Sequence, residues 1–204
     1  LAGSLGAAGI APSDIDLVVL THGHPDHIGG TVGDDGRPVF DRAVHVMAPA
    51  EWAFWTSKDT LATVPERFRQ IADHNLPPIS DQLQLATGEV EVAPGVTLLP
   101  TPGHTPGHLA VVLASGGQEL LYLSDALVHP IQLEHPGWGP KYDIDRQQAE
   151  ASRRMLCERA VRNGSLVHAF HFDPFPCLGR IVPGGDAWCW EPVALGAVPV
   201  PVSV

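Results

Sequence analysis

Short apolar runs separated by turn-forming residues dominate the chain, and most of these runs have the length of a β-strand. Val, Ile and Leu fill the runs, while Gly, Pro and Asp bound them, which is typical of buried strands joined by loops. The pattern predicts strands over residues 16–21, 44–47, 83–85, 89–92, 96–99, 109–113, 119–123 and 166–170, with a small ribbon over 180–182 and 187–190.

Helices are predicted between these strands. The longest covers residues 145–162, where Asp145 precedes the first turn and Asn163-Gly164 follows the last. Strands mixed with helices in a chain of 204 residues predict a single α/β domain over residues 1–204. Shorter helices are expected over 2–8, 49–55 and 66–74. The apolar, proline-spaced tail over 197–204 is expected to lie extended on the protein surface or on a partner.

The most informative segment is His22-Gly23-His24-Pro25-Asp26-His27, directly after the apolar run 17–20. Imidazole and carboxylate groups together suit zinc and similar divalent ions. Four such groups this close together cannot all face one ion without strain. Alternating positions on a tight loop could instead serve two neighbouring ions.

Three further ligand-type residues follow apolar strands. His104 lies in the rigid loop Thr101–His108, which contains two Pro-Gly pairs, and Asp125 and His171 each come at the end of a predicted strand. Functional residues of layered α/β proteins gather on loops at strand ends. We therefore expect these residues to meet the first cluster in space.

Composition narrows the function classes. The formal net charge is −11 with His neutral, which argues against nucleic acid as a partner, because Lys and Arg carry that binding. No apolar run approaches the roughly 20 residues of a membrane span, so no membrane partner is expected. The three cysteines show no metal-binding spacing and are expected to be reduced thiols. The compartment stays open: cytoplasmic by default, with secretion or a periplasmic location as alternatives.

The order His-x-His-x-Asp-His, then His104, Asp125 and His171, resembles the metallo-β-lactamase superfamily. The resemblance extends from about Ile15 to Trp190, and the segments 51–55, 124–129, 171–176 and 190–193 are similar to the group of methyl parathion hydrolase and lactonase-like hydrolases. It implies an αββα sandwich. Members carry several strands before the first motif, where this chain has one, so we expect a sandwich lacking part of its N-terminal half.

The resemblance also implies a role for each ligand. His22, His24 and His104 would hold one ion, Asp26, His27 and His171 the other, and Asp125 would bridge the two. Zinc is the expected metal, with manganese, cobalt and iron compatible with the same donors. A hydroxide bridging the ions would attack an ester, lactone or organophosphate, and Asp26, bound through one oxygen, is the candidate catalytic residue that orients it.

The substrate is expected to be small and neutral or apolar. Trp52, Trp55 and Phe68 could form an aromatic wall for it, although ordinary helix packing explains their spacing equally well. His129, four residues after Asp125, is a further candidate for the pocket. His108, the second histidine of its loop, is expected either to support a metal ligand from outside the site or to have a structural role, and a homodimer is possible.

Other functions fit part of the same pattern. A glyoxalase II-like thioester hydrolase would use the same ligands, whereas a persulfide dioxygenase would hold one iron and leave Asp26 and His27 largely unused. A catalytically inactive binding protein on the same fold is the non-enzyme alternative. Metal content separates the two-ion hydrolase from the one-iron oxygenase.

Overall fold

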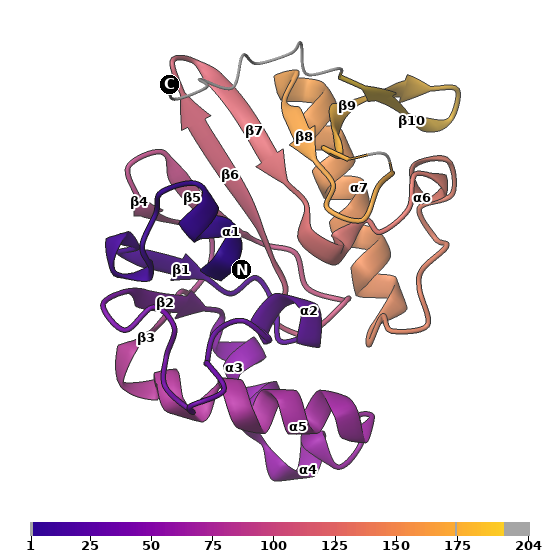
Figure 1. Ribbon diagram of the computed structural model, residues 1–204. Coiled ribbons are helices and arrows are strands. Elements are labelled where there is room, and N and C mark those ends of the chain that lie inside the picture. Colours follow the sequence, from indigo (N-terminus) through magenta and orange to yellow (C-terminus); the bar gives the residue numbers. More distant parts are fainter. Residues whose placement is uncertain (1, 174, 194–204) are drawn as a thin grey trace.

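The computed structural model describes residues 2–173 and 175–193. Two β-sheets lie face to face and helices cover their outer sides, which makes four layers (Figure 1). The first sheet is parallel throughout. Its three strands, in the order β1-β2-β3, are β1 (Leu17–Val19), β2 (Val44–Met47) and β3 (Leu83–Leu85).

The second sheet has seven strands in the order β10-β9-β8-β7-β6-β5-β4. Neighbouring strands are antiparallel except β7 and β8, which run parallel because the long helix α7 (Arg146–Asn163) connects them. The strands are β4 (Val90–Ala93), β5 (Val96–Pro100), β6 (Leu109–Ser115), β7 (Gln118–Tyr122), β8 (Leu166–His168), β9 (Leu178–Gly184) and β10 (Ala187–Pro192).

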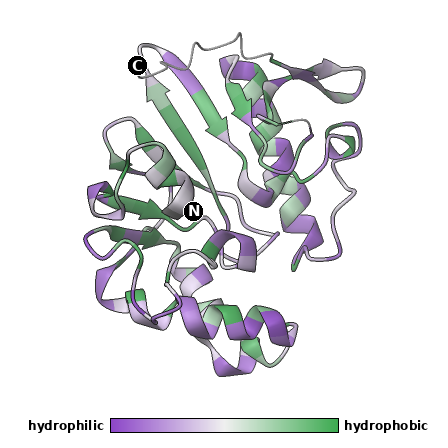
Figure 2. Cartoon of the chain, in the orientation of Figure 1, coloured by the Kyte–Doolittle hydropathy of each residue, from purple (hydrophilic) through white to green (hydrophobic). Residues whose placement is uncertain are grey.

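Alternating side chains along the strands build the layers. Successive residues of a strand point to opposite faces, so β5 places Leu98 between the sheets and Leu99 in the core beneath α7. β2 likewise sends Val46 between the sheets and Met47 toward the helices of the first sheet. Hydrophobic residues therefore follow the strands, while the outer helices carry most of the polar surface (Figure 2).

The four predicted helices are present within about two residues of their expected ends. The structure adds short helices that the sequence pattern did not indicate, including one inside the first histidine cluster, which was expected to be an irregular loop. The helices besides α7 are α1 (Ala2–Ala7), α2 (Pro25–Ile28), α3 (Pro49–Thr56), α4 (Lys58–Leu61), α5 (Glu66–Asn75) and α6 (Ile131–Glu134), with 3-10 turns at Pro12–Asp14, Pro77–Gln82 and Ser124–Ala126.

The αββα sandwich predicted from the sequence is confirmed. The expected tail over residues 197–204 lies outside the described residues. Within the described part of the chain, none of the helices combines the length and apolar character needed to cross a bilayer. The ends of the two sheets meet where the backbone N–H of Leu109 donates to the carbonyl oxygen of Thr21 at 2.9 Å. That junction lies beside the loops that carry the histidines.

Candidate metal centre

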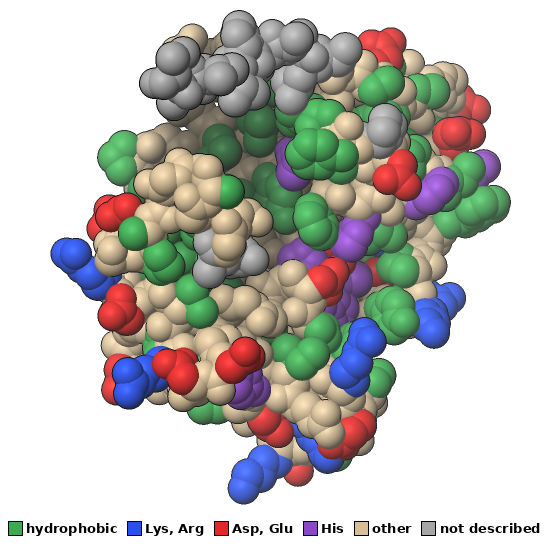
Figure 3. Space-filling model, viewed as in Figure 1, with side chains coloured by type: hydrophobic (Ala, Val, Ile, Leu, Met, Phe, Trp, Pro, Cys, Tyr) green, Lys and Arg blue, Asp and Glu red, His purple; other side chains and the backbone are tan. Residues whose placement is uncertain are grey.

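Four loops at neighbouring strand ends bring the predicted ligands together. The loop after β1 leads into α2 and supplies the first cluster, the β5–β6 loop supplies His104, the turn after β7 supplies Asp125, and the loop after β8 supplies His171. Histidine side chains accordingly gather in a hollow of the surface beside acidic and hydrophobic groups (Figure 3). The donor atoms fall into two sets.

The first set joins His22, His24, His104 and Asp125. Nδ1 of His24 lies 3.1 Å from Nε2 of His22 and 2.9 Å from Nε2 of His104. Oδ2 of Asp125 lies 3.7 Å and 3.5 Å from the same two Nε2 atoms. Ligands at zinc–nitrogen distances in a tetrahedral site are about 3.3 Å apart. The spacing of this set therefore fits one divalent ion.

The second set joins Asp26, His27, Asp125 and His171. Oδ1 of Asp125 lies 3.0 Å from Nε2 of His27 and 3.2 Å from Nε2 of His171, while Oδ2 of Asp26 lies 3.6 Å and 3.7 Å from those nitrogens. His27 Nε2 and Asp125 Oδ1 are both buried without a hydrogen bond of acceptable geometry. Converging polar atoms left unsatisfied in this way are what a metal site provides.

Asp125 belongs to both sets, and its two oxygens divide between them. Oδ2 faces the first set and Oδ1 the second. A carboxylate can bind one ion through each oxygen, so the geometry fits a bridging ligand. Asp125 is 6% exposed, which keeps competing water away from it.

His22 and His24 of the first set are held neutral, as metal binding requires. Burial, with the neighbouring imidazole of His104, lowers the pKa of His24 to about 4. Burial also lowers the pKa of His22 well below its usual value, and the nearby His108 and His27 add to the effect. A neutral imidazole offers a lone pair, so His22 and His24 are ready to bind a cation near pH 7.

The second set behaves differently because it is more open. The carboxylate of Asp125, with Oδ1 at 3.2 Å from Nε2 of His171, raises the pKa of His171. Burial opposes ionisation of Asp125, but the adjacent imidazoles of His171 and His27 outweigh it and hold the pKa of that carboxyl well below its usual range. Asp125 is thus a carboxylate, with one oxygen facing each set.

Groups outside the donor sets fix the ligand orientations. Nδ1 of His104 lies 2.9 Å from Oδ1 of Asp143, and the other oxygen of Asp143 pairs with Arg153. Arg153 also donates to the carbonyl oxygens of Ala126, at 2.8 Å, and Pro136, at 2.9 Å. Asp143 makes Nδ1 of His104 the protonated nitrogen, which frees Nε2 for a metal.

His108 holds Asp125 in place. Its Nε2 accepts a hydrogen bond from the backbone N–H of Asp125 at 3.1 Å, so its Nδ1 carries the proton and donates to Thr101 Oγ1 at 2.8 Å. Burial and the nearby His104 lower the pKa of His108 to about 3, which keeps this tautomer neutral. The structural role expected of His108 matches this placement.

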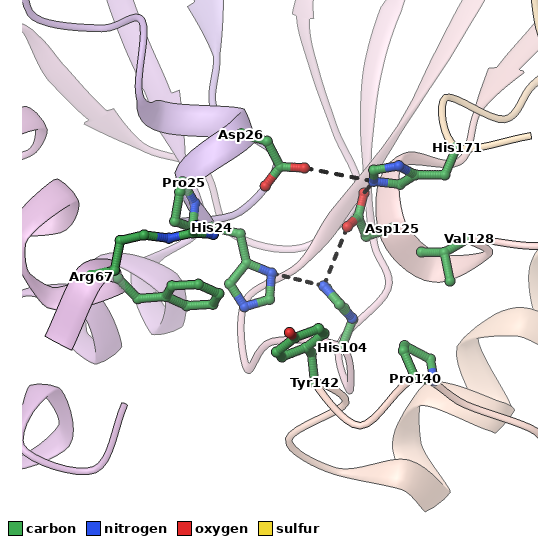
Figure 4. Close-up of a pocket in the computed structure, with 11 residues that line it drawn as sticks. His24, Pro25, Asp26, Arg67, His104, Asp125, Val128, Pro140, Tyr142 and His171 are labelled. Atoms are coloured by element: carbon green, nitrogen blue, oxygen red, sulfur yellow. Dashed lines mark hydrogen bonds and ion pairs between the residues drawn. The ribbon is translucent and has the colours of Figure 1, made fainter. Parts of the chain in front are cut away.

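A cavity of about 570 Å³ opens over both donor sets. Figure 4 shows Asp26 and His171 facing each other on one side of Asp125, with His24 and His104 on another. Apolar and aromatic side chains continue the wall beyond the donor atoms. These wall residues are Phe68, Val128, Pro140 and Tyr142, with Arg67 alongside them.

Three of the four predicted pocket residues do not line this cavity. Trp55 is 1% exposed and packs with Trp52 in the core between the first sheet and its helices, so ordinary helix packing explains both. His129 is exposed, and its Nδ1 accepts a hydrogen bond from the backbone N–H of Ile131. Of the four, Phe68 is the one that lines the cavity, on a different helix from the tryptophans.

Sequence reasoning also missed Asp143, Arg153 and Glu51 as members of the site. All three are buried. Asp143 contacts His104 directly, Arg153 pairs with Asp143, and Glu51 contacts the loops that carry His22, His24 and His104. Asp143 and Arg153 stand in no local pattern with His104, so only the folded chain brings them together. Glu51 belongs to the segment 51–55, which is similar to the lactonase-like group, but its neighbours along the chain do not indicate a contact with the loops.

A four-layer α/β sandwich with two histidine–carboxylate donor sets at its strand ends defines the class of metal-binding metallo-β-lactamase-like proteins. The family model described as the metallo-beta-lactamase superfamily matches residues 1–167. The chain belongs to this superfamily. Within it, the predicted similarity to the lactonase-like group is confirmed by the relatives below.

Two relatives are N-acyl homoserine lactonases. The one from Bacillus cereus is 28% identical over 164 residues, and the one from Bacillus sp is 29% identical over 165 residues. Each alignment covers 80% of this chain and 58% of the relative, so the chain spans less than two thirds of their length.

Two solved structures superpose with TM-scores of 0.84. One is AidC, a dizinc quorum-quenching lactonase in complex with a product, at 27% identity. The other is the hydrolase AbOPH of the beta-lactamase superfamily, at 25% identity. Each comparison covers 96% of this chain and 70% of the other.

Proposed function

We propose that this chain is a metal-dependent hydrolase that binds two divalent ions, most readily zinc, and opens the ring of a lactone. N-acyl homoserine lactones are the proposed substrates, because the relatives in Bacillus and AidC are named for lactone hydrolysis. The observation that carries the proposal is the division of the Asp125 oxygens between two donor sets beneath one cavity.

The ligand assignment follows the two sets. His22, His24 and His104 would hold the first ion, and Asp26, His27 and His171 the second, with Asp125 shared. When bound, two such ions acidify a water molecule and polarise a carbonyl oxygen. Two ions carry four positive charges and the two carboxylates remove two, so the centre favours an anionic transition state.

Asp26 is the proposed proton carrier. Its side chain is 53% exposed and Oδ2 faces the second set, which leaves the other carboxylate oxygen available to water in the cavity. The water oxygen adds to the lactone carbonyl carbon, and the bond from that carbon to the ring oxygen breaks. The proton that Asp26 takes from the water passes to the departing ring oxygen, giving a hydroxy acid.

The cavity wall supports a neutral substrate with an apolar arm. Phe68 and Tyr142 lie with ring centroids 6.0 Å apart, and both rings pack edge-on against His24. An acyl chain against this wall would place its lactone ring over the donor atoms. Removing such a chain from water is favourable by about 0.8 kcal/mol per methylene group.

The two donor sets and the cavity also bear on the alternative functions, which are a one-iron dioxygenase, a thioester hydrolase and an inactive binding protein. A one-iron dioxygenase would leave Asp26 and His27 without a role, yet both lie in a second donor set. A thioester hydrolase would use the same centre, so substrate preference decides between it and a lactonase. A binding protein without activity would not need a solvent-accessible carboxylate over the metal site.

The test is a substrate panel on protein stripped of metal and then reconstituted with zinc. The probes are N-hexanoyl homoserine lactone, an aryl ester, a phosphotriester and an acyl thioester. We expect the lactone to be hydrolysed fastest, and only by the reconstituted protein. A preference for the thioester or the phosphotriester would contradict the proposed substrate, and no turnover of any probe would contradict the enzyme.

A further inference from the structure

Glu51 is a buried carboxylate that links the two histidine loops of the first donor set. It lies in the first turn of α3 and is fully inaccessible to solvent. Its Oε1 accepts from the backbone N–H of Gly23 at 2.8 Å, between His22 and His24 in the chain. Its Oε2 accepts from the backbone N–H of Gly107 at 2.8 Å, in the loop that carries His104.

The packing around Glu51 is tight on both sides. A Cβ on Gly23 would meet the Trp55 ring at 2.3 Å, and a Cβ on Gly107 would meet the backbone nitrogen of Glu51 at 2.3 Å. Both loops therefore approach α3 closely because they have glycine at the contact. Trp55 Nε1 donates a third hydrogen bond to Glu51 Oε1 at 2.6 Å, which fixes the carboxylate between the loops.

We infer that Glu51 is a positioning residue that sets the distance between the two loops and so builds the first metal-binding set. Each carboxylate oxygen holds one loop, and three donors satisfy a group that would be costly to bury alone. The two contact points lie next to His22, His24 and His104 of the first set, whereas Asp26 and His27 follow on α2 and His171 lies on another loop. The second set should depend on Glu51 much less.

Glutamine at this position would break the link without changing its size. An amide offers one oxygen and one NH2 group, so it cannot accept from both loops. When its oxygen faces Gly23 and Trp55, its NH2 group points at the N–H of Gly107. Glu51→Asp is a second variant, which keeps the charge but is one methylene too short to reach both loops.

The inference rests on the proposed two-ion centre, and the experiment separates the two. Zinc affinity is measured by chelator competition in two backgrounds. His171→Ala weakens the second set and leaves the first ion, and His104→Ala weakens the first set and leaves the second. We expect Glu51→Gln to weaken zinc binding at least about tenfold in the His171→Ala background and less than about threefold in the His104→Ala background. Glu51→Asp should show the same preference.

Trp55→Phe is the matched control. It removes one donor to the same carboxylate and keeps both loop contacts, so it should retain the first ion. Equal weakening in both backgrounds, or unchanged affinity in the His171→Ala background, would overturn the inference. Parent protein that binds no zinc would overturn the proposed centre and the inference with it.

Discussion

The carboxylate of Asp143 accepts from His104, with Oδ1 lying 2.9 Å from Nδ1 of the imidazole. Both side chains are buried, and Arg153 balances the charge of Asp143 on its far side. The contact determines which nitrogen of His104 carries a proton. Through it, a residue 39 positions along the chain controls a proposed metal ligand.

Asp143→Asn should lower the zinc affinity of the first set. An asparagine oriented with its NH2 group toward His104 favours the wrong tautomer, and Arg153 loses its ionic partner. Loss of such a ligand-orienting contact costs about 10- to 100-fold in metal affinity. Zinc competition measures it. Asp145→Asn is the matched control, because Asp145 is exposed and caps α7 through the N–H of Gln148, a role that Asn also fills. Equal losses in both variants would contradict the orienting role.

The backbone conformation of Ser124 predicts different free energies of unfolding for Ser124→Gly and Ser124→Ala. Its φ is 47°, in the left-handed region, and its Oγ lies 2.9 Å from Thr21 Oγ1. Both Ser124→Gly and Ser124→Ala remove the hydrogen bond, but only Gly relieves the backbone. We expect Gly to be more stable than Ala by about 1 kcal/mol. Urea unfolding of metal-free protein measures this, and an Ala variant as stable as Gly would contradict it.

Phe68→Ala should change substrate choice more than turnover. The ring lines the cavity and packs against His24 and Tyr142, so its loss removes apolar wall from an acyl chain. We expect kcat/KM to fall about tenfold for a long-chain acyl lactone and little for a short-chain one. Phe54→Ala is the control, because Phe54 is half-buried against the core under the first sheet and does not line the cavity. A uniform decrease across chain lengths would contradict a wall function.

The proposed ligands could be predicted from the sequence because residues of metal-binding type occur close together in it. Three histidines and an aspartate within residues 22–27 have few uses other than metal binding, and His104, Asp125 and His171 each follow an apolar strand. Strand ends meet in a layered fold, so proximity followed from the predicted elements. The strands could be predicted from the sequence because each one buries a face and therefore carries apolar residues.

The surroundings of the site depended on packing that no local pattern encodes. Trp52 and Trp55 share a helix face, but spacing alone does not reveal that the face points into the core under the first sheet. Phe68 and Tyr142 meet across 74 positions and form the wall instead. Glu51 and Asp143 act through contacts made only after the layers assemble.

Removing the metal should destabilise the fold. Ligands that bind only the folded state stabilise it by about 2.7 kcal/mol at a hundredfold excess over Kd. For a chain of this size that corresponds to a fall in Tm of about 5 to 10 °C on chelation. Differential scanning calorimetry with and without chelator measures the shift, and zinc should reverse it. An identical Tm in both conditions would contradict metal binding by the folded protein.

The most direct test of the central claim is the zinc content of the parent chain and of Asp125→Asn, measured on protein dialysed against limiting zinc. One carboxylate shared by both sets predicts two zinc ions per parent chain and weaker zinc binding at both sets in Asp125→Asn. Asp26→Asn should weaken zinc binding at the second set alone. A parent chain that holds one ion, or an Asp125→Asn variant that keeps one site at full affinity, would contradict the shared-carboxylate centre.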